Sequence, residues 1–136
     1  METEEEHQAA LFAWAALAGK KYPELRWLHH IPNCGSRGDS TRSRSITGAK
    51  LKAQGVKPGV ADIFLPVARH GHHGLYIEMK KPSLRPKRTD SAGGLSAEQA
   101  EFGYFVYLQD YLFHVCYSWQ DASMLIEEYL SPTTKG

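Results

Sequence analysis

The sequence predicts an α+β fold, of the α/β layer type, in which helices flank a mixed central β-sheet. Two short apolar runs, VADIFLP and GLYIEMK, are joined by a Gly/His-rich turn and predict a β-hairpin. Segments of helical periodicity at both ends and after the hairpin predict helices, and the run LFHVCYSW predicts a further strand. Elements in this order pack as layers around one core. A chain of 136 residues is expected to form one domain, 1–136.

The first helix is expected to run from Thr3 to about Ala18. Thr3 caps it, Glu6 stands three residues later in the capping-box position, and Gly19 ends the helix. Its buried stripe is predicted to consist of Leu11, Trp14, Ala15 and Ala18. The apolar run 25–31 then predicts a first strand.

The hairpin is the centre of the functional prediction. A short helix over 46–54, ended by Gly55, precedes strands over 60–66 and 74–80. A hairpin centred on residue 70 places Asp62 directly opposite Glu78, on one face of the sheet, with Cβ atoms roughly 4.5–5.5 Å apart. A register slip of one residue would send the two acids to opposite faces.

The last third predicts helix, strand and helix. Ser96 begins a helix to about Asp110 with Gln99 in a capping box, 112–119 forms a strand, and 120–130 forms the last helix. The buried face of that helix is predicted to consist of Ala122, Leu125, Ile126 and Tyr129.

The net charge of +1 hides a strong segregation of charge. Between Ser36 and Arg88 lie twelve of the sixteen Lys and Arg residues, but three of the fifteen acids. A basic side around the two acids suits a polyanion such as DNA, although solvated basic loops are the alternative. The residues expected to hold phosphates are Arg37, Arg42, Arg44, Lys50, Lys52 and Lys57.

Membrane and export signals are absent from the sequence. No apolar stretch approaches the ~18 residues that span a bilayer, and METEEEH is acidic, unlike a signal or transit peptide. A soluble, cytoplasmic protein is expected. Cys34 and Cys116 have no metal-type spacing and are expected to be free thiols.

Asp62 and Glu78 can hold a divalent cation. Facing carboxylates repel unless one takes a proton or a cation lies between them. Mg²⁺ accepts one or two carboxylates, several waters and a substrate phosphate, so Mg²⁺ or Mn²⁺ is expected. Lys80 projects from the same face and could orient or deprotonate a nucleophile or offset transition-state charge. A surface acid pair is the alternative, but Glu78 lies within an apolar run.

In this chain Asp62 is followed, after fifteen residues, by Glu78 and then, after one residue, by Lys80. This order and spacing is the pattern of PD-(D/E)xK nucleases. The segments GVKPGVADIFLP, LYIEMKKP, LSAEQAEF and WQDASMLIEEYL resemble the VRR-NUC family in wording and order. Ala61 and Pro58 depart from its usual residues. The resemblance implies a restriction-endonuclease-like core and metal-dependent DNA cleavage. It also implies that stand-alone phage and bacterial members are homodimers that cleave branched DNA such as Holliday junctions.

The resemblance also assigns site residues. It implies that Asp62, Glu78 and the Met79 carbonyl hold the metal, that Lys80 is the catalytic lysine, and that Gln99 belongs to the catalytic site. It further places a first-helix acid near the metal, which falls on Glu4 with Gln8 four residues later. The alternative for Glu4, Glu5 and Glu6 is that acids in a first turn simply favour the helix dipole. The alternative for Gln99 is a role in the capping box with Ser96 alone.

Other residues are weaker candidates. His70, His72 and His73 are read as exposed turn residues and not as metal ligands. His29 and His30 point to opposite faces, so one of them could approach the site. The helical spacing of Tyr104, Phe105, Tyr107 and Tyr111 predicts burial in the core, ahead of a dimer surface or base stacking.

The functional prediction is a Mg²⁺- or Mn²⁺-dependent DNA endonuclease of a bacterial cell or phage-infected host. The alternatives are a nucleic-acid-binding module without turnover, and a restriction-type or exonucleolytic enzyme on the same core.

Overall fold

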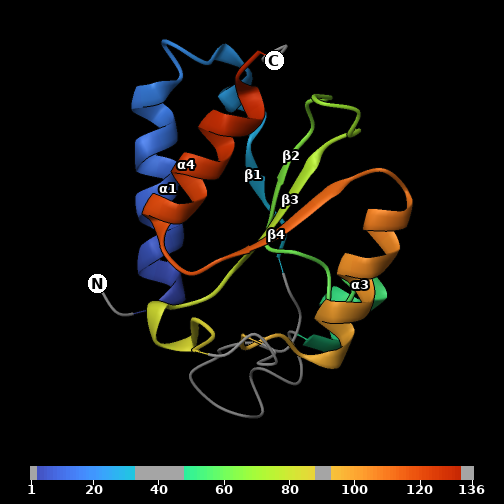
Figure 1. Ribbon diagram of the computed structural model, residues 1–136. Helices are drawn as coiled ribbons and strands as arrows, with labels where there is room; N and C mark the ends of the chain where they lie inside the picture. The colour runs from blue at the N-terminus through green and yellow to red at the C-terminus, as the bar shows by residue number, and fades with distance from the viewer. Residues whose placement is uncertain (1–2, 33–47, 88–92, 133–136) are drawn as a thin grey trace.

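A mixed four-stranded sheet forms the centre of the computed structural model, which describes residues 3–32, 48–87 and 93–132 (Figure 1). The strands lie in the order β1 (His29–His30), β2 (Ile63–Leu65), β3 (Leu75–Met79) and β4 (Leu112–Cys116). The β1–β2 and β2–β3 pairs are antiparallel, and β4 is parallel to β3. The predicted α+β fold with a mixed sheet is confirmed.

Helices cover both faces of the sheet. α1 (Glu4–Ala18) and α4 (Trp119–Leu130) lie side by side on one face, and α3 (Ala97–Leu108) lies on the other (Figure 1). Residues 48–53 are helical, within the range predicted for the short helix. None of the helices described is long and apolar enough to cross a membrane.

The core lies between the sheet and the α1/α4 pair. Leu11 of α1, Ile126 of α4, and Ile63 and Ile77 of the hairpin are all fully buried there. Each buried aliphatic side chain contributes about 1.5–3 kcal/mol of transfer free energy. The opposite sheet face carries a stack of rings, with Phe64 and Tyr76 centroids 4.3 Å apart. Aliphatic side chains on the core face and aromatic rings on the α3 face therefore fix the hairpin between them.

The predicted hairpin register is confirmed. Ile63 pairs with Ile77 and Leu65 with Leu75, so the ladder is centred on residue 70. His70 and Gly71 have φ values of 54° and 82°, as in the two-residue turns that match strand twist. The buried aliphatic pairs hold this register, because a one-residue slip would bring Ile63 and Ile77 out of the core.

Helix caps also follow the sequence. The Thr3 hydroxyl accepts a hydrogen bond from the Glu6 amide (3.1 Å) and donates one to its carboxylate (3.0 Å). At α3 the Ser96 side chain accepts from the Gln99 amide and the Gln99 side chain accepts from the Ser96 amide. The Thr3 cap and the capping box of Ser96 and Gln99 both satisfy amide groups that a helix N-terminus leaves without partners.

The strand predicted over 25–31 is wrong. Residues Pro23–Trp27 form a 3₁₀ helix, and only His29–His30 pair as β1. Pro23 favours a helical first turn, and the buried residues Leu25 and Leu28 are three apart, which is a helical spacing. The other strands are shorter than predicted. Strand β4 ends at Cys116, a buried free thiol as predicted, because Ser118 already caps α4.

Gly59 brings the approach to β2 against the start of α3. Its φ is +87°, and a Cβ built there would lie 2.6 Å from the Glu98 carbonyl oxygen. Only glycine combines this backbone conformation with so close an approach. The contact places Asp62, three residues later, beside the first turn of α3.

Candidate active site

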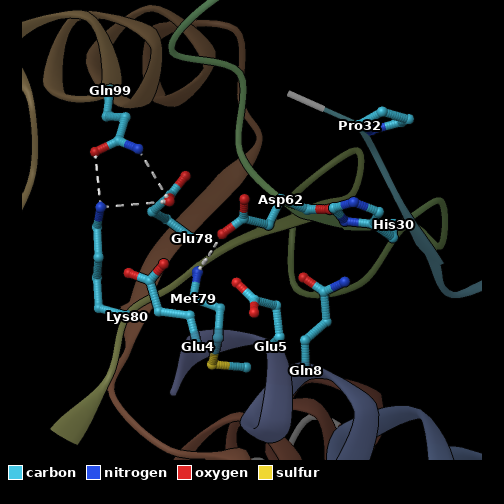
Figure 2. A pocket seen from close by; sticks show the side chains of 10 residues that line it. All are labelled: Glu4, Glu5, Gln8, His30, Pro32, Asp62, Glu78, Met79, Lys80 and Gln99. Atoms are coloured by element: carbon cyan, nitrogen blue, oxygen red, sulfur yellow. Dashed lines mark hydrogen bonds and ion pairs between the residues drawn. The ribbon is translucent and has the colours of Figure 1, made fainter. Parts of the chain in front are cut away.

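Ten residues from distant parts of the chain line one pocket of about 340 Å³ at the end of the hairpin (Figure 2). They come from the first turns of α1 and α3, from β1 and the residues after it, and from the ends of β2 and β3. The lining residues are Glu4, Glu5, Gln8, His30, Pro32, Asp62, Glu78, Met79, Lys80 and Gln99. All six residues predicted as catalytic or metal-binding are among them.

Asp62 is held between two strands. One carboxylate oxygen, Oδ2, accepts a hydrogen bond from the Met79 amide at 2.9 Å. The Asp62 carbonyl accepts from the Ile31 amide (2.6 Å) and contacts His30 Nδ1 (2.9 Å). The backbone and one oxygen are thereby fixed, and the carboxylate faces the pocket (Figure 2).

Glu78 is a buried carboxylate with incomplete hydrogen bonding. The residue is 2% exposed, and its Oε2 accepts from Gln99 Nε2 at 3.1 Å and lies 3.8 Å from Lys80 Nζ. Its other oxygen, Oε1, is buried and has no hydrogen-bond partner among the residues that the structure describes. A buried charge without full pairing is costly, so this oxygen favours a proton or a cation.

The pKa of Glu78 is raised to about 9. Burial is the largest cause, followed by the negative charge of Asp62 and the hydrogen bond that a protonated Glu78 can donate to Asp62, while Lys80 lowers the pKa and Glu4 raises it. At neutral pH Glu78 therefore keeps its proton unless a cation replaces it.

Gln99 connects the lysine to the acid. Its Oε1 accepts from Lys80 Nζ at 3.0 Å, and its Nε2 donates to Glu78 (Figure 2). Lysine only donates and a carboxylate only accepts, so the amide can bridge them in this orientation alone. The same Oε1 accepts from the Ser96 amide at 2.9 Å. Gln99 thus serves both the capping box and the site, which the sequence left as alternatives.

Comparison with known proteins adds one match. No family model matches the sequence, and no curated protein matches it. A solved structure of a VRR_NUC domain protein is similar over 96% of this chain and 89% of that chain, with 25% sequence identity and a TM-score of 0.68. The predicted resemblance to the VRR-NUC family is confirmed by this match. The sheet and its flanking helices thus match the core of that nuclease domain family.

The first turns of α1 face the VRR-NUC pocket. Glu4, Glu5 and Gln8 all line it, whereas the Glu6 carboxylate accepts from the capping Thr3 hydroxyl. Glu4 is half-buried and its charge reaches Glu78, so it is a better candidate than Glu6 for the first-helix acid.

The donor set fits a hard divalent cation. Across 3–32, 48–87 and 93–132, no three His, Cys, Asp or Glu side chains are grouped closely enough to hold a metal by themselves. Mg²⁺ needs fewer protein ligands, because it keeps several waters and takes oxygen atoms from a phosphate. Asp62 and Glu78 supply two carboxylates, and the partnerless Glu78 Oε1 gives the pair a physical reason to bind a cation.

His30 is a pocket residue that the predicted VRR-NUC site did not include. The sequence indicated that His29 or His30 could approach the site, and the structure selects His30. A carbonyl only accepts, so the His30 Nδ1 contact with Asp62 places the ring proton on Nδ1. The antiparallel pairing of β1 with β2 creates this contact, and no local sequence signal reports it.

The predicted phosphate-binding residues are only partly described. Lys50, Lys52 and Lys57 are exposed, and Arg37, Arg42 and Arg44 lie outside the described residues, as does Cys34. His70 and His72 line a separate pocket with His114, and no metal-binding group is found there among the residues described.

The bridge through Gln99 gives a testable prediction. Gln99→Ala removes the acceptor of Lys80 and the donor to Glu78, so cleavage should fall by about 10–100-fold, as for other residues that position ligands. Ser96→Ala is the matched control, because it weakens the cap by ~1 kcal/mol but keeps the bridge. Single-turnover cleavage and urea unfolding of both variants separate the roles. Equal activity loss in both would assign Gln99 to the cap alone.

Proposed function

We propose that this protein is a Mg²⁺- or Mn²⁺-dependent DNA endonuclease that hydrolyses phosphodiester bonds through Asp62, Glu78 and Lys80. The observation that carries the proposal is the burial of Glu78 beside Asp62, with one Glu78 oxygen lacking a partner among the described residues, in a pocket that also contains a buried lysine. A site that only bound nucleic acid would have no use for a buried glutamate beside a second acid in a basic protein segment.

Each side chain has a definable task. When bound by Asp62 and Glu78, a divalent cation polarises a phosphoryl oxygen and lowers the pKa of a water molecule. Lys80 uses one of its three N–H donors on Gln99, which leaves donors for a phosphate oxygen or an attacking water. Its positive charge also offsets the charge that develops in the transition state. Gln99 holds the ammonium group beside Glu78.

The DNA form and the assembly belong to the same proposal. Exposed Lys50 and Lys52, together with the predicted arginines, favour a polyanionic backbone. We infer branched DNA, such as a Holliday junction, as the substrate. One site makes one cut, so symmetric cleavage of a junction requires two copies related by a twofold axis. The setting inferred for this activity is the cytoplasm of a bacterial or phage-infected cell.

A substrate panel tests the proposal. Four-way junction, flap and linear duplex DNA are incubated with the protein in Mg²⁺, in Mn²⁺ and in EDTA. Cleavage of branched DNA in either metal and none in EDTA is expected. Cleavage that continues unchanged in EDTA would contradict metal dependence. Cuts that depend on sequence or on free ends would instead identify a restriction-type or exonucleolytic enzyme.

A nucleic-acid-binding module without turnover is the remaining alternative. It predicts retarded DNA in EDTA, Mg²⁺ and Mn²⁺ alike, with every strand intact on a denaturing gel. The buried Glu78 and Lys80 beside Asp62 argue against it, because binding alone needs no such set of side chains.

A further inference from the structure

Helix α3 is apolar on two opposite faces. Gly103 and Val106 face the sheet and are buried, and a Cβ at Gly103 would lie 2.6 Å from the Phe113 ring. On its outer face, Tyr104, Phe105 and Tyr107 are 65%, 60% and 63% exposed. The prediction that these three residues are buried in the core is wrong, because the helix turns Gly103 toward the sheet. Tyr111, after the helix, is half-buried and stacks on Tyr76.

A helix with large apolar residues on two opposite faces is expected to pack against a neighbour on each of those faces. Leu108, at 56% exposed, extends the outer patch along the helix. Scattered exposed apolar residues are ordinary, but a contiguous set on one helix face marks an interaction surface. Among the described residues, therefore, no segment covers the outer face of α3.

A groove of about 690 Å³ runs beside this face. The segment before β2 forms one wall with Lys57, Pro58 and Val60, and α3 forms the other. The α3 wall consists of Glu98, Glu101, Phe102, Tyr104, Phe105 and Leu108. The groove thus has an apolar floor, one basic residue on one wall and two acids on the other. Within the described residues, none of these three charges is in an ion pair.

The charges decide between two occupants. A nucleic acid would meet Glu98 and Glu101 beside the aromatic rings, and its phosphates would be repelled by them. A second copy related by a twofold axis instead brings its Lys57 toward Glu98 or Glu101 of the first copy, and the reverse pair forms at the same time. A groove with a basic residue on one wall and two acids on the other is therefore complementary to the same groove of a second copy.

We propose that the outer face of α3, with the groove beside it, is the surface on which a second copy of this chain docks. The inference deepens the homodimer in the proposed function but does not depend on cleavage. Gln99 points from the same helix into the pocket, whereas Glu98 and Glu101 line the groove. Docking on α3 would therefore leave the pocket open and hold the two sites in a fixed relation.

Sedimentation velocity in EDTA tests the surface without involving activity. Wild type is expected to sediment as a dimer at micromolar concentration, and Phe105→Glu should weaken association by at least ~30-fold, as for an aromatic anchor at an interface centre. Leu17→Glu and Met124→Glu are matched controls, because both residues are large, apolar and at least as exposed but lie on α1 and α4. Both controls should remain dimeric.

A charge exchange tests the twofold pairing. Lys57→Glu should weaken the dimer, and adding Glu98→Lys or Glu101→Lys should restore it. A wild-type monomer, or dissociation by the two controls but not by Phe105→Glu, would overturn the proposal. It would also fail if neither exchange restored association. If Phe105→Glu stayed dimeric but lost DNA binding in EDTA, the face would be a nucleic-acid surface.

Discussion

Replacing Lys80 with alanine should reduce DNA cleavage by about 10²–10³-fold, the loss expected when one group that stabilises transition-state charge is removed. Lys80 is 8% exposed, and its ammonium group is fixed in the pocket by Gln99 and Glu78. It is the one lysine or arginine among the described residues that line the pocket, so no neighbour can take its place. Single-turnover cleavage of the preferred DNA in Mg²⁺ measures the effect.

Lys81 offers a matched control for this prediction. It is the next residue in the chain, carries the same charge and is exposed outside the pocket. Lys81→Ala should keep near-wild-type cleavage, and DNA affinity measured in EDTA should be similar for both variants. If Lys80→Ala and wild type cleave at the same rate, Lys80 has no catalytic role and the nuclease proposal fails.

The hairpin could be predicted because its determinants are local. Buried aliphatic residues at alternate positions, joined by a turn containing Gly71, allow one register, and that register places Asp62 opposite Glu78. The caps at Thr3 and Ser96 are likewise set by residues three positions apart. Patterns of this kind are read directly from the sequence, so the sequence alone predicts the pocket residues of the hairpin.

The remaining features depend on contacts between distant segments. His30 reaches the pocket because β1 pairs with β2, which brings its ring to the Asp62 carbonyl, thirty-two positions away in the chain. The exposure of Phe105 depends on the close approach of Gly103 to Phe113, which rotates the outer face of α3 away from the sheet. Periodicity shows that a helix has an apolar face but not which of two apolar faces meets the sheet. Tertiary packing made that choice.

Glu78 should make the metal-free protein less stable as pH rises. Its pKa in the folded state is about 9, above the ordinary value of 4.5, so the folded protein holds a proton that the unfolded chain releases between these values. The unfolded state then binds fewer protons, and the free energy of unfolding falls with pH by up to about 1.4 kcal/mol per unit. This contribution is fully present below pH 4.5 and is lost as pH approaches 9.

Glu78→Gln isolates this effect. Glutamine does not titrate, and its amide can donate to Asp62 as the protonated acid does, so the Glu78 contribution to the pH slope should disappear. Urea unfolding in EDTA between pH 5 and pH 9 measures the slope. Glu128→Gln, at an exposed site on α4, should keep the wild-type slope. Equal pH slopes of the unfolding free energy for wild type and Glu78→Gln would show that Glu78 does not hold this proton.

The same variant connects stability with function. A cation that replaces the shared proton binds the folded state alone, so Mg²⁺ should raise the unfolding free energy of wild type according to its affinity. The gain should be larger at pH 8 than at pH 5.5, because displacing the Glu78 proton costs less free energy at the higher pH. Glu78→Gln should show little gain and little cleavage while being more stable than metal-free wild type at pH 8. Stabilisation by Mg²⁺ that is the same in both proteins would place the cation elsewhere. We therefore expect the carboxylate that destabilises the metal-free fold at high pH to be the one that binds the cation.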